Sequence, residues 1–118
     1  MKIQFDQIPE VVTPNMRGGL GEVAGHTFLD GDNRIVRGIL RPGSTIGLHT
    51  HDTNSEIIYI LAGTGKVLCD GVYEPLAAGD CHYCPRGHEH SLINDSDGDL
   101  AYFAVIPQHA TGTWPTSP

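Results

Sequence analysis

Apolar and polar residues alternate along most of the chain with a period close to two residues. Turn-forming residues interrupt this alternation about every ten positions, for example at Pro42-Gly43 and Asp70-Gly71. Because successive side chains of a strand point to opposite faces, the pattern predicts short strands joined by tight turns, and few helices.

Eight segments fit this description, namely residues 22–29, 34–40, 45–50, 56–61, 65–69, 80–84, 89–93 and 100–106. Eight or more short antiparallel strands predict an all-β sandwich or barrel. The interior or mouth of such a barrel is the natural place for a ligand site.

The length of the chain limits the number of domains. Its 118 residues suffice for one domain of ordinary size and not for two. We expect a single domain over residues 1–118, with a core at about 16–108 and a loosely attached tail at 109–118. The role of Trp114, which lies in that tail, stays open.

Charge and composition exclude several classes of partner. Seven basic residues against 14 acidic ones leave a net charge of −7, and no basic segment can follow a nucleic-acid backbone. The longest apolar run, residues 57–62, is too short to cross a membrane. Residues 1–10 lack the apolar region of a secretory signal, so we expect a cytoplasmic protein.

The cysteines do not indicate a disulfide scaffold, because Cys69, Cys81 and Cys84 are an odd number in a chain that can build its own core. Cys81 and Cys84 have the Cys-x-x-Cys spacing of some zinc and redox sites. Residues three apart on a strand face opposite sides, however, so we expect strand packing instead, with one thiol free to face the interior.

The clearest candidates for metal binding are the two histidines of the segment His49-Thr50-His51. In an extended strand, side chains two residues apart share a face and lie about 7 Å apart, so both imidazoles can reach one ion. The chain re-enters a strand at Glu56, and His90 follows the turn of residues 85–88. Three imidazoles and a carboxylate suit one divalent transition metal (Mn, Fe, Ni, Co, Cu or Zn) and leave two positions open in an octahedral ion.

At these residues the chain resembles the cupin superfamily, because two spaced motifs are complete. The first consists of Gly43, His49, His51, Glu56 and Gly63, with five, one, four and six residues between them. The second consists of Gly79, Pro85, Gly87, His90 and Asn94, with five, one, two and three residues between them. The resemblance implies a jelly-roll barrel, also called a double-stranded β-helix, that is commonly a homodimer and holds a metal through His49, His51, Glu56 and His90.

Such families include oxygenases, decarboxylases, isomerases, lyases and non-catalytic binding proteins, and the fold does not choose among them. A divalent ion with three neutral imidazoles and one carboxylate keeps a positive charge, so the expected small-molecule ligand is anionic or enolisable. The leading hypothesis is a metal-dependent enzyme of dioxygenase, decarboxylase or isomerase type. The alternatives are a non-catalytic, metal-anchored binding or sensor protein, and a structural or storage barrel.

Three residues are candidates for proton transfer or substrate contact. His88 and Glu89 lie beside the second motif near the barrel mouth, where they are either proton carriers or solvated loop residues. His26, on an early strand, reaches a ligand only if it faces inward, and a structural role fits it equally. His82 and His109 have no partner visible in the sequence, so we expect them at the surface.

Strand parity and arginine position give the last expectations. Ile58 and Ile60 share the parity of Glu56, so they are predicted to line the pocket, whereas Tyr59 points the other way. Three arginines near strand ends are Arg37, Arg41 and Arg86. A clamp for a phosphate or carboxylate would use such residues, but we expect a surface role for them.

Overall fold

The computed structural model describes residues 1–109, so Trp114 and most of the predicted tail lie outside the described residues. The described chain forms two short 3-10 helices and ten strands. The helices are η1 (Phe5–Gln7) and η2 (Met16–Gly18). The strands are β1 (Val11–Pro14), β2 (Glu22–Leu29), β3 (Asn33–Leu40), β4 (His49–Thr50), β5 (Glu56–Ala62), β6 (Thr64–Cys69), β7 (Val72–Ala77), β8 (Cys81–Cys84), β9 (Glu89–Ile93) and β10 (Leu100–Pro107).

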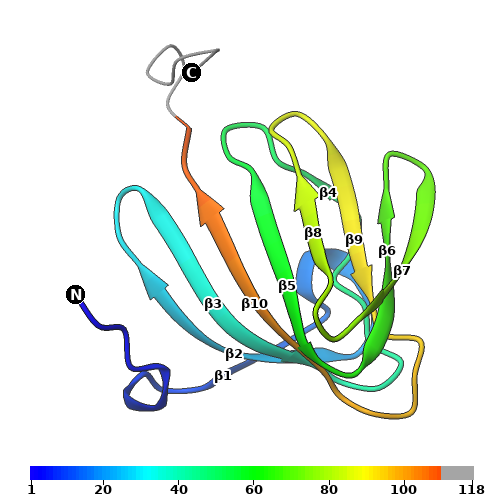
Figure 1. Cartoon of the computed structure of the whole chain (residues 1–118), viewed down its shortest axis with the longest axis horizontal. Coiled ribbons are helices and arrows are strands. Elements are labelled where there is room, and N and C mark those ends of the chain that lie inside the picture. Colours follow the sequence, from blue (N-terminus) through cyan, green and yellow to red (C-terminus); the bar gives the residue numbers. More distant parts are fainter. Residues whose placement is uncertain (110–118) are drawn as a thin grey trace.

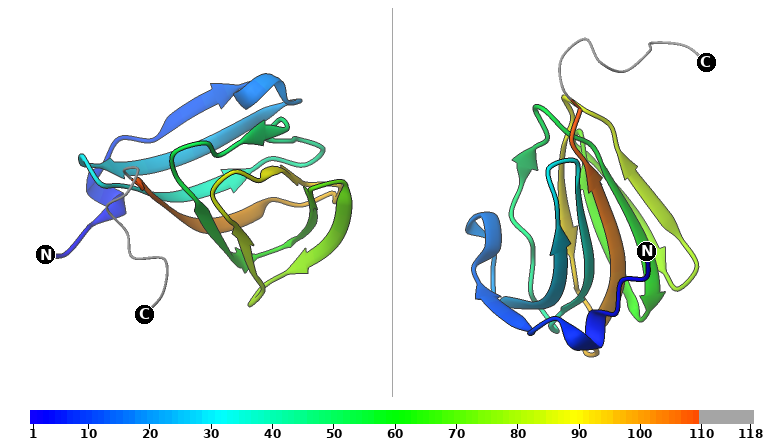
Figure 2. Two further views of the ribbon diagram at one scale, coloured as in Figure 1. Left: turned by 90° about the horizontal axis from the view of Figure 1, so that it is seen from above. Right: turned by 90° about the vertical axis from the view of Figure 1, so that its left-hand side faces the viewer.

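These strands form two antiparallel sheets. The larger has the order β1-β2-β3-β10-β5-β8 and the smaller the order β4-β9-β6-β7 (Figure 1). Both sheets curl around a common interior, which the view from above shows most clearly (Figure 2). The predicted all-β barrel is therefore confirmed.

The core lies between the sheets because each strand alternates buried and exposed side chains. On β5, Glu56, Ile58 and Ile60 are buried, whereas Tyr59 is 42% exposed on the outer face, as its parity predicts. Apolar side chains from both sheets complete the core, among them Leu40, Leu100 and Ala104 from the larger sheet and Val67, Leu76 and Leu92 from the smaller.

Two strands, β1 and β7, were not predicted from the sequence pattern. Each contains a proline, Pro14 in β1 and Pro75 in β7, which argues against a strand because proline cannot donate a backbone hydrogen bond. Both strands lie at the edge of their sheet, where an unpaired backbone position is tolerated.

The strand predicted over residues 45–50 is mostly absent, since only His49–Thr50 form a strand there. The backbone before it is bonded to the chain around η2. The N–H groups of Thr45 and Gly47 donate to the carbonyl oxygens of Leu20 and Met16, at 2.9 and 3.0 Å. These bonds replace the ladder that a regular strand would need.

Tight turns stand where the sequence places them. Asp70 and Gly71 join β6 to β7 with φ of 49° and 81°, the left-handed values of a two-residue hairpin turn. Gly63 has φ of 89°, and a Cβ there would lie 2.3 Å from the Asp99 carbonyl oxygen, so a larger residue would displace the chain.

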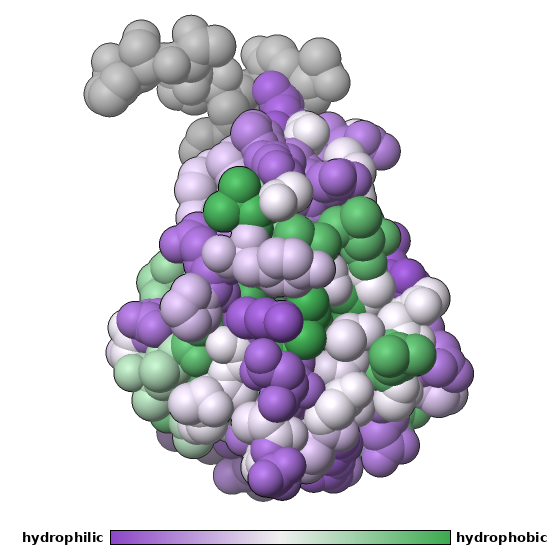
Figure 3. All heavy atoms as spheres, turned by 90° about the vertical axis from the view of Figure 1, so that its right-hand side faces the viewer, coloured by the Kyte–Doolittle hydropathy of each residue, from purple (hydrophilic) through white to green (hydrophobic). Residues whose placement is uncertain are grey.

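The outer surface of the described chain is mixed in character. Seen from the β6–β7 side, apolar side chains are scattered among polar ones (Figure 3). No helix within residues 1–109 is long and apolar enough to span a membrane.

Candidate metal centre

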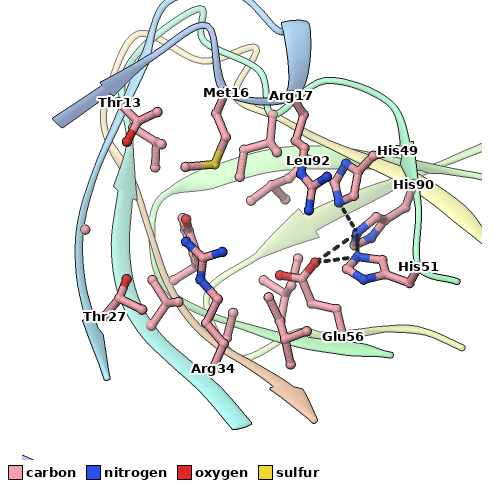
Figure 4. Close-up of a pocket in the computed structure, with 18 of the residues that line it drawn as sticks. Thr13, Met16, Arg17, Thr27, Arg34, His49, His51, Glu56, His90 and Leu92 are labelled. Carbon is pink, nitrogen blue, oxygen red and sulfur yellow. Dashed lines mark hydrogen bonds and ion pairs between the residues drawn. The ribbon is translucent and has the colours of Figure 1, made fainter. Parts of the chain in front are cut away.

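Four side chains with metal-binding atoms meet at one end of the interior (Figure 4). His49 on β4 pairs with His90 on β9, so their side chains are neighbours in the smaller sheet. Glu56 is the first residue of β5 in the larger sheet, and His51 follows β4 directly. This His/Glu cluster (His49, His51, Glu56 and His90) therefore connects the two sheets.

The donor atoms of the cluster lie at distances that suit a single ion. The Nε2 atom of His90 lies 2.9 Å from Nε2 of His51 and 3.2 Å from Nε2 of His49. The Oε1 atom of Glu56 lies 2.9 Å from Nε2 of His90 and 3.1 Å from Nε2 of His51. Ligands at right angles around an ion, with bonds of about 2.1 Å, are separated by about 3.0 Å.

Hydrogen bonds outside the cluster fix the tautomers of two imidazoles. Nδ1 of His49 donates to the carbonyl oxygen of Gly47 at 2.6 Å, and Nδ1 of His51 donates to Oδ1 of Asn54 at 2.5 Å. A carbonyl or amide oxygen accepts and does not donate, so each proton belongs on Nδ1. The Nε2 lone pair of each neutral ring then faces the centre of the cluster.

His82 fixes the tautomer of the third imidazole, that of His90. The prediction that His82 lies at the surface is therefore wrong. It lies on β8 with 7% exposure, and its Nε2 is 2.9 Å from Nδ1 of His90. Burial, aided by the nearby charge of His90, lowers the pKa of His82 to about 4. A neutral His82 can therefore accept the Nδ1 proton of His90. Strand parity carried this signal, because His82 shares a face with Cys84, which is fully buried.

The cluster is electrostatically suited to a cation. In the metal-free protein, burial opposes the ionisation of Glu56, but attraction to the His51 and His90 rings when these carry a second proton outweighs it and lowers the pKa of Glu56 to about 2. The contact with Glu56 likewise raises the pKa of His51, whereas burial lowers that of His49. Neutral nitrogen lone pairs about 3 Å apart repel one another unless a positive charge lies between them. The donor set therefore fits a divalent metal.

A cavity of about 370 Å³ extends from the cluster toward solvent. Its walls are mainly apolar and include Val36, Ile46, Ile58, Leu92 and Ala104. Five polar residues that the sequence did not identify also line it, namely Thr13, Arg17, Thr27, Arg34 and Tyr102. Such an apolar cleft with a few convergent polar groups is typical of a small-molecule site.

None of the three candidate proton carriers lines this cavity. His88 is exposed, and its Nδ1 forms a hydrogen bond with the carboxylate of Asp70. Glu89 is exposed beside it. His26 lies on the outer side of β2, where its Nδ1 donates to the carbonyl oxygen of Ile8 at 2.6 Å.

The cysteines behave as strand parity predicts. Cys84 is buried and Cys81 is exposed, so they lie on opposite faces of β8. Cys69, Cys81 and Cys84 are all free thiols.

The three arginines that the sequence analysis considered as an anion clamp lie outside the cavity. Arg37 donates to Asp6 at 2.6 Å, and Arg41 donates to Asp99 at 3.2 Å, both away from the cavity. Arg86 is exposed and does not line the cavity. The signal for Arg34 was its parity, since it shares the inner face of β3 with Leu40.

Comparison with known proteins shows which family the chain belongs to. The model of the cupin domain matches residues 36–106, a region that contains all four members of the His/Glu cluster. An oxalate-binding protein from Thermotoga maritima is 37% identical over 112 residues, which cover 90% of this chain and 93% of that protein.

Solved structures show the same relationship. The crystal structure of a predicted oxalate decarboxylase from Thermotoga maritima superposes with a TM-score of 0.85 at 36% identity, over 92% of this chain and 99% of the other. A sugar phosphate isomerase of the cupin superfamily from Silicibacter pomeroyi gives a TM-score of 0.73 at 21% identity, over 92% and 76% of the two chains, a likeness of fold alone. The chain belongs to the cupin family.

Proposed function

We propose that the protein binds a small carboxylate through a divalent transition metal held by His49, His51, Glu56 and His90. The observation that carries this proposal is the convergence of three imidazole nitrogens and one carboxylate oxygen within 4.8 Å at the end of a cavity. A bound metal supplies positive charge and open coordination positions for a ligand oxygen. The donor set suits Mn, Fe, Ni, Co, Cu and Zn.

The cavity favours an anionic ligand. A divalent ion with three neutral imidazoles and the Glu56 carboxylate retains positive charge, to which Arg17 and Arg34 add. The relative from Thermotoga maritima is named for its binding of oxalate, a ligand of this class. Oxalate is therefore the first ligand to test, followed by enolisable oxygen compounds.

Binding without turnover is the function that the lining side chains support best. Acid–base catalysis needs a group beside the substrate that exchanges a proton near neutral pH. Outside the His/Glu cluster, the ionisable side chains that line the cavity within residues 1–109 are Arg17, Arg34 and Tyr102. Arginine does not lose its proton in proteins, and burial raises the pKa of Tyr102.

An enzyme is the second candidate function. It is favoured by the similarity to a structure described as a predicted oxalate decarboxylase, and by the coordination positions that four protein ligands leave open. Decarboxylation, dioxygenation and isomerisation all consume or convert the bound ligand. Chemical analysis of the ligand therefore separates this candidate from binding.

The metal is tested by elemental analysis of protein purified without an affinity tag or chelator. We expect one equivalent of a divalent transition metal, lost in His49→Ala and His90→Ala with the circular dichroism spectrum retained. His26→Ala removes a histidine outside the cavity and should keep the metal. Full occupancy in both ligand variants, or no metal in the wild type after reconstitution, contradicts the proposed site.

The ligand is tested by calorimetric titration of oxalate into metal-loaded and metal-free protein, followed by assay of the oxalate after incubation under air and under argon. Binding that requires the metal and leaves the oxalate unchanged supports the proposal. Metal-dependent loss of oxalate selects the enzyme instead. If oxalate does not bind the loaded protein, carboxylate binding is wrong.

We infer that the protein is a homodimer, as the family resemblance predicts. The outer face of β5 and β8 carries the apolar side chains Ile57, Tyr59, Leu61 and Tyr83, which are 39–57% exposed. Apolar side chains gathered on a sheet face are typical of subunit contacts. Light scattering that gives the monomer mass across the micromolar range would contradict this inference.

We also place the protein in the cytoplasm. Free thiols at Cys69, Cys81 and Cys84 support this location, because a reducing compartment maintains that state. Fractionation of the source cells tests it, and recovery in an exported fraction contradicts it.

A further inference from the structure

The cavity has two further charged side chains besides the His/Glu cluster. Arg17 and Arg34 extend into it from different walls, and Arg17 lies beside His49 of the cluster (Figure 4). Both residues also line a smaller hollow next to the β2–β3 turn, so they stand where the cavity opens to solvent. Within residues 1–109, Glu56 is the only carboxylate that lines the cavity itself, whereas Asp30 and Asp32 line the smaller hollow outside it. The two arginines are therefore the cationic side chains that a ligand in the cavity can meet besides a bound metal.

These two arginines lack the partner that a neighbouring arginine has. Arg37 lies on the same strand as Arg34 but on the outer face, and donates to Asp6 at 2.6 Å. In the described part of the chain, neither Arg17 nor Arg34 has a carboxylate within ion-pair distance. Both residues are exposed, so their guanidiniums are free to donate to an external anion that enters the cavity.

Tyr102 also lines this cavity. It pairs with Gly38 across β10 and β3, and its ring covers that glycine so closely that a Cβ there would lie 2.5 Å from Cζ of the ring. This packing fixes the ring, and no buried side-chain polar atom of the described residues is left without a hydrogen-bond partner. The phenol hydroxyl can therefore donate to an acceptor atom of a ligand without carrying an unsatisfied buried group in the empty cavity.

The backbone of Arg17 packs against Gly47, the residue that also orients His49. Arg17 has φ of 55°, a left-handed conformation that a side chain rarely adopts. A Cβ on Gly47 would lie 2.1 Å from the Arg17 carbonyl oxygen, so the two backbones are packed together without room for a side chain. The carbonyl oxygen of Gly47 also accepts the Nδ1 proton of His49. Gly47 thus connects the backbone of Arg17 with the side chain of His49.

We propose that Arg17, Arg34 and Tyr102 form a second anion subsite, which makes the cavity selective for dicarboxylates over monocarboxylates. This inference rests on the proposed function, because it assigns one carboxylate group of the ligand to the metal end. The other carboxylate group accepts hydrogen bonds from the two guanidiniums and the hydroxyl. Two such anchors recognise a ligand that is anionic at both ends.

The size of the cavity agrees with this ligand class. At roughly 30 Å³ per atom, the volume of one water molecule, the six non-hydrogen atoms of oxalate take about 180 Å³. The cavity of about 370 Å³ therefore has room for oxalate with ordered water, and also for longer diacids with an apolar middle.

The test is calorimetric titration of the metal-loaded full chain with oxalate, malonate and succinate as dicarboxylates, and with formate and acetate as monocarboxylates. We expect at least one dicarboxylate to bind the wild type at least tenfold more tightly than acetate. Arg34→Gln and Arg17→Gln should weaken that dicarboxylate about 10- to 100-fold, and Tyr102→Phe about tenfold, with acetate unchanged within twofold. Arg34→Lys, which keeps the charge, should recover part of the loss.

Arg37→Gln is the matched control, because it makes the same substitution on the opposite face of the same strand and should change no affinity. Metal content is measured for every variant, so that a loss of the ion is not mistaken for a loss of the subsite. Equal affinity of the wild type for both ligand classes overturns the subsite while the proposed function stands. The same holds if Arg34→Gln weakens acetate as much as the dicarboxylate. If no carboxylate binds the loaded wild type, the proposed function and the subsite are both wrong.

Discussion

His82 allows the most direct test of how the cluster is held in place. Its Nε2 atom lies 2.9 Å from Nδ1 of His90, a residue that is only 1% exposed. Replacing His82 by Phe keeps a buried ring and removes the acceptor. The Nδ1 proton of His90 is then left without a partner, and the ring is free to rotate or to move its proton to Nε2, where it blocks metal binding.

The size of the effect follows from this single hydrogen bond. A buried donor left without an acceptor costs about 1–3 kcal/mol. Substitution of groups that orient metal ligands typically weakens metal affinity about 10- to 100-fold, or about 1.4–2.8 kcal/mol. We therefore expect His82→Phe to bind the metal about 10- to 100-fold more weakly than the wild type, with a folded β spectrum.

The assay is competition with a chromophoric chelator at constant pH, and two further variants make it specific. His82→Gln supplies an amide oxygen that can accept from His90 and should restore most of the affinity. His26→Phe makes the same change as His82→Phe at a histidine outside the cavity and should leave metal affinity unchanged. Wild-type affinity in His82→Phe, or equal loss in the Gln variant, would refute the role of the hydrogen bond.

Three further predictions concern the apo protein and its thiols. Tyr102→Phe should change the stability of ligand-free protein by no more than about 0.5 kcal/mol in urea unfolding, because the Tyr102 hydroxyl is not a buried group left without a hydrogen bond; a larger change in either direction contradicts this. The pKa of His82 falls from 6.5 to about 4 on folding. As the pH is lowered, His82 therefore takes up a proton in the unfolded chain before it does so in the folded protein. The contribution of His82 to metal-free stability is then complete above pH 6.5 and falls by up to about 3 kcal/mol toward pH 4, a slope that should be absent in His82→Phe. Burial raises the pKa of Cys84 to about 12, so mass spectrometry after iodoacetamide treatment at pH 8 should find Cys81 alkylated and Cys84 intact; equal labelling contradicts the assigned faces.

Much of the fold was predictable because the information was local. Seven of the eight predicted strands form with ends within a few residues of their expected positions, since alternation and turn residues act over short distances. The exceptions have physical causes that the pattern does not contain. Pro14 and Pro75 occupy edge strands, and the backbone of residues 45–47 bonds to the chain around η2, which is distant in sequence.

The same distinction applies to the site. His49, His51 and Glu56 come from one short segment, and the second motif brings in His90, so motif spacing was enough to group them. His82 was missed because a histidine alone on a strand carries no spacing signal, although its parity with Cys84 was visible. Glu89 was selected for its position beside His90, but neighbours on a strand face opposite sides. His88 lies before β9 and turns to Asp70, and His26 was expected to reach a ligand only if it faced inward, whereas it contacts Ile8 outside the cavity.

The separation in sequence between the metal-binding cluster and the two cavity arginines gives a physical reason why one family supports many functions. The four cluster residues lie inside the region that the cupin model matches, residues 36–106, whereas Arg17 and Arg34 lie before it. The matched strands determine the metal end, because His49 and His90 are paired in the smaller sheet and Glu56 begins a strand of the larger one. Arg17 stands on η2 and Arg34 near the start of β3, so a homologue can change these two side chains without changing the residues that bind the metal. Among cupins, differences in the ligand that is bound should therefore correlate with differences in the N-terminal segment more closely than with differences in the two motifs.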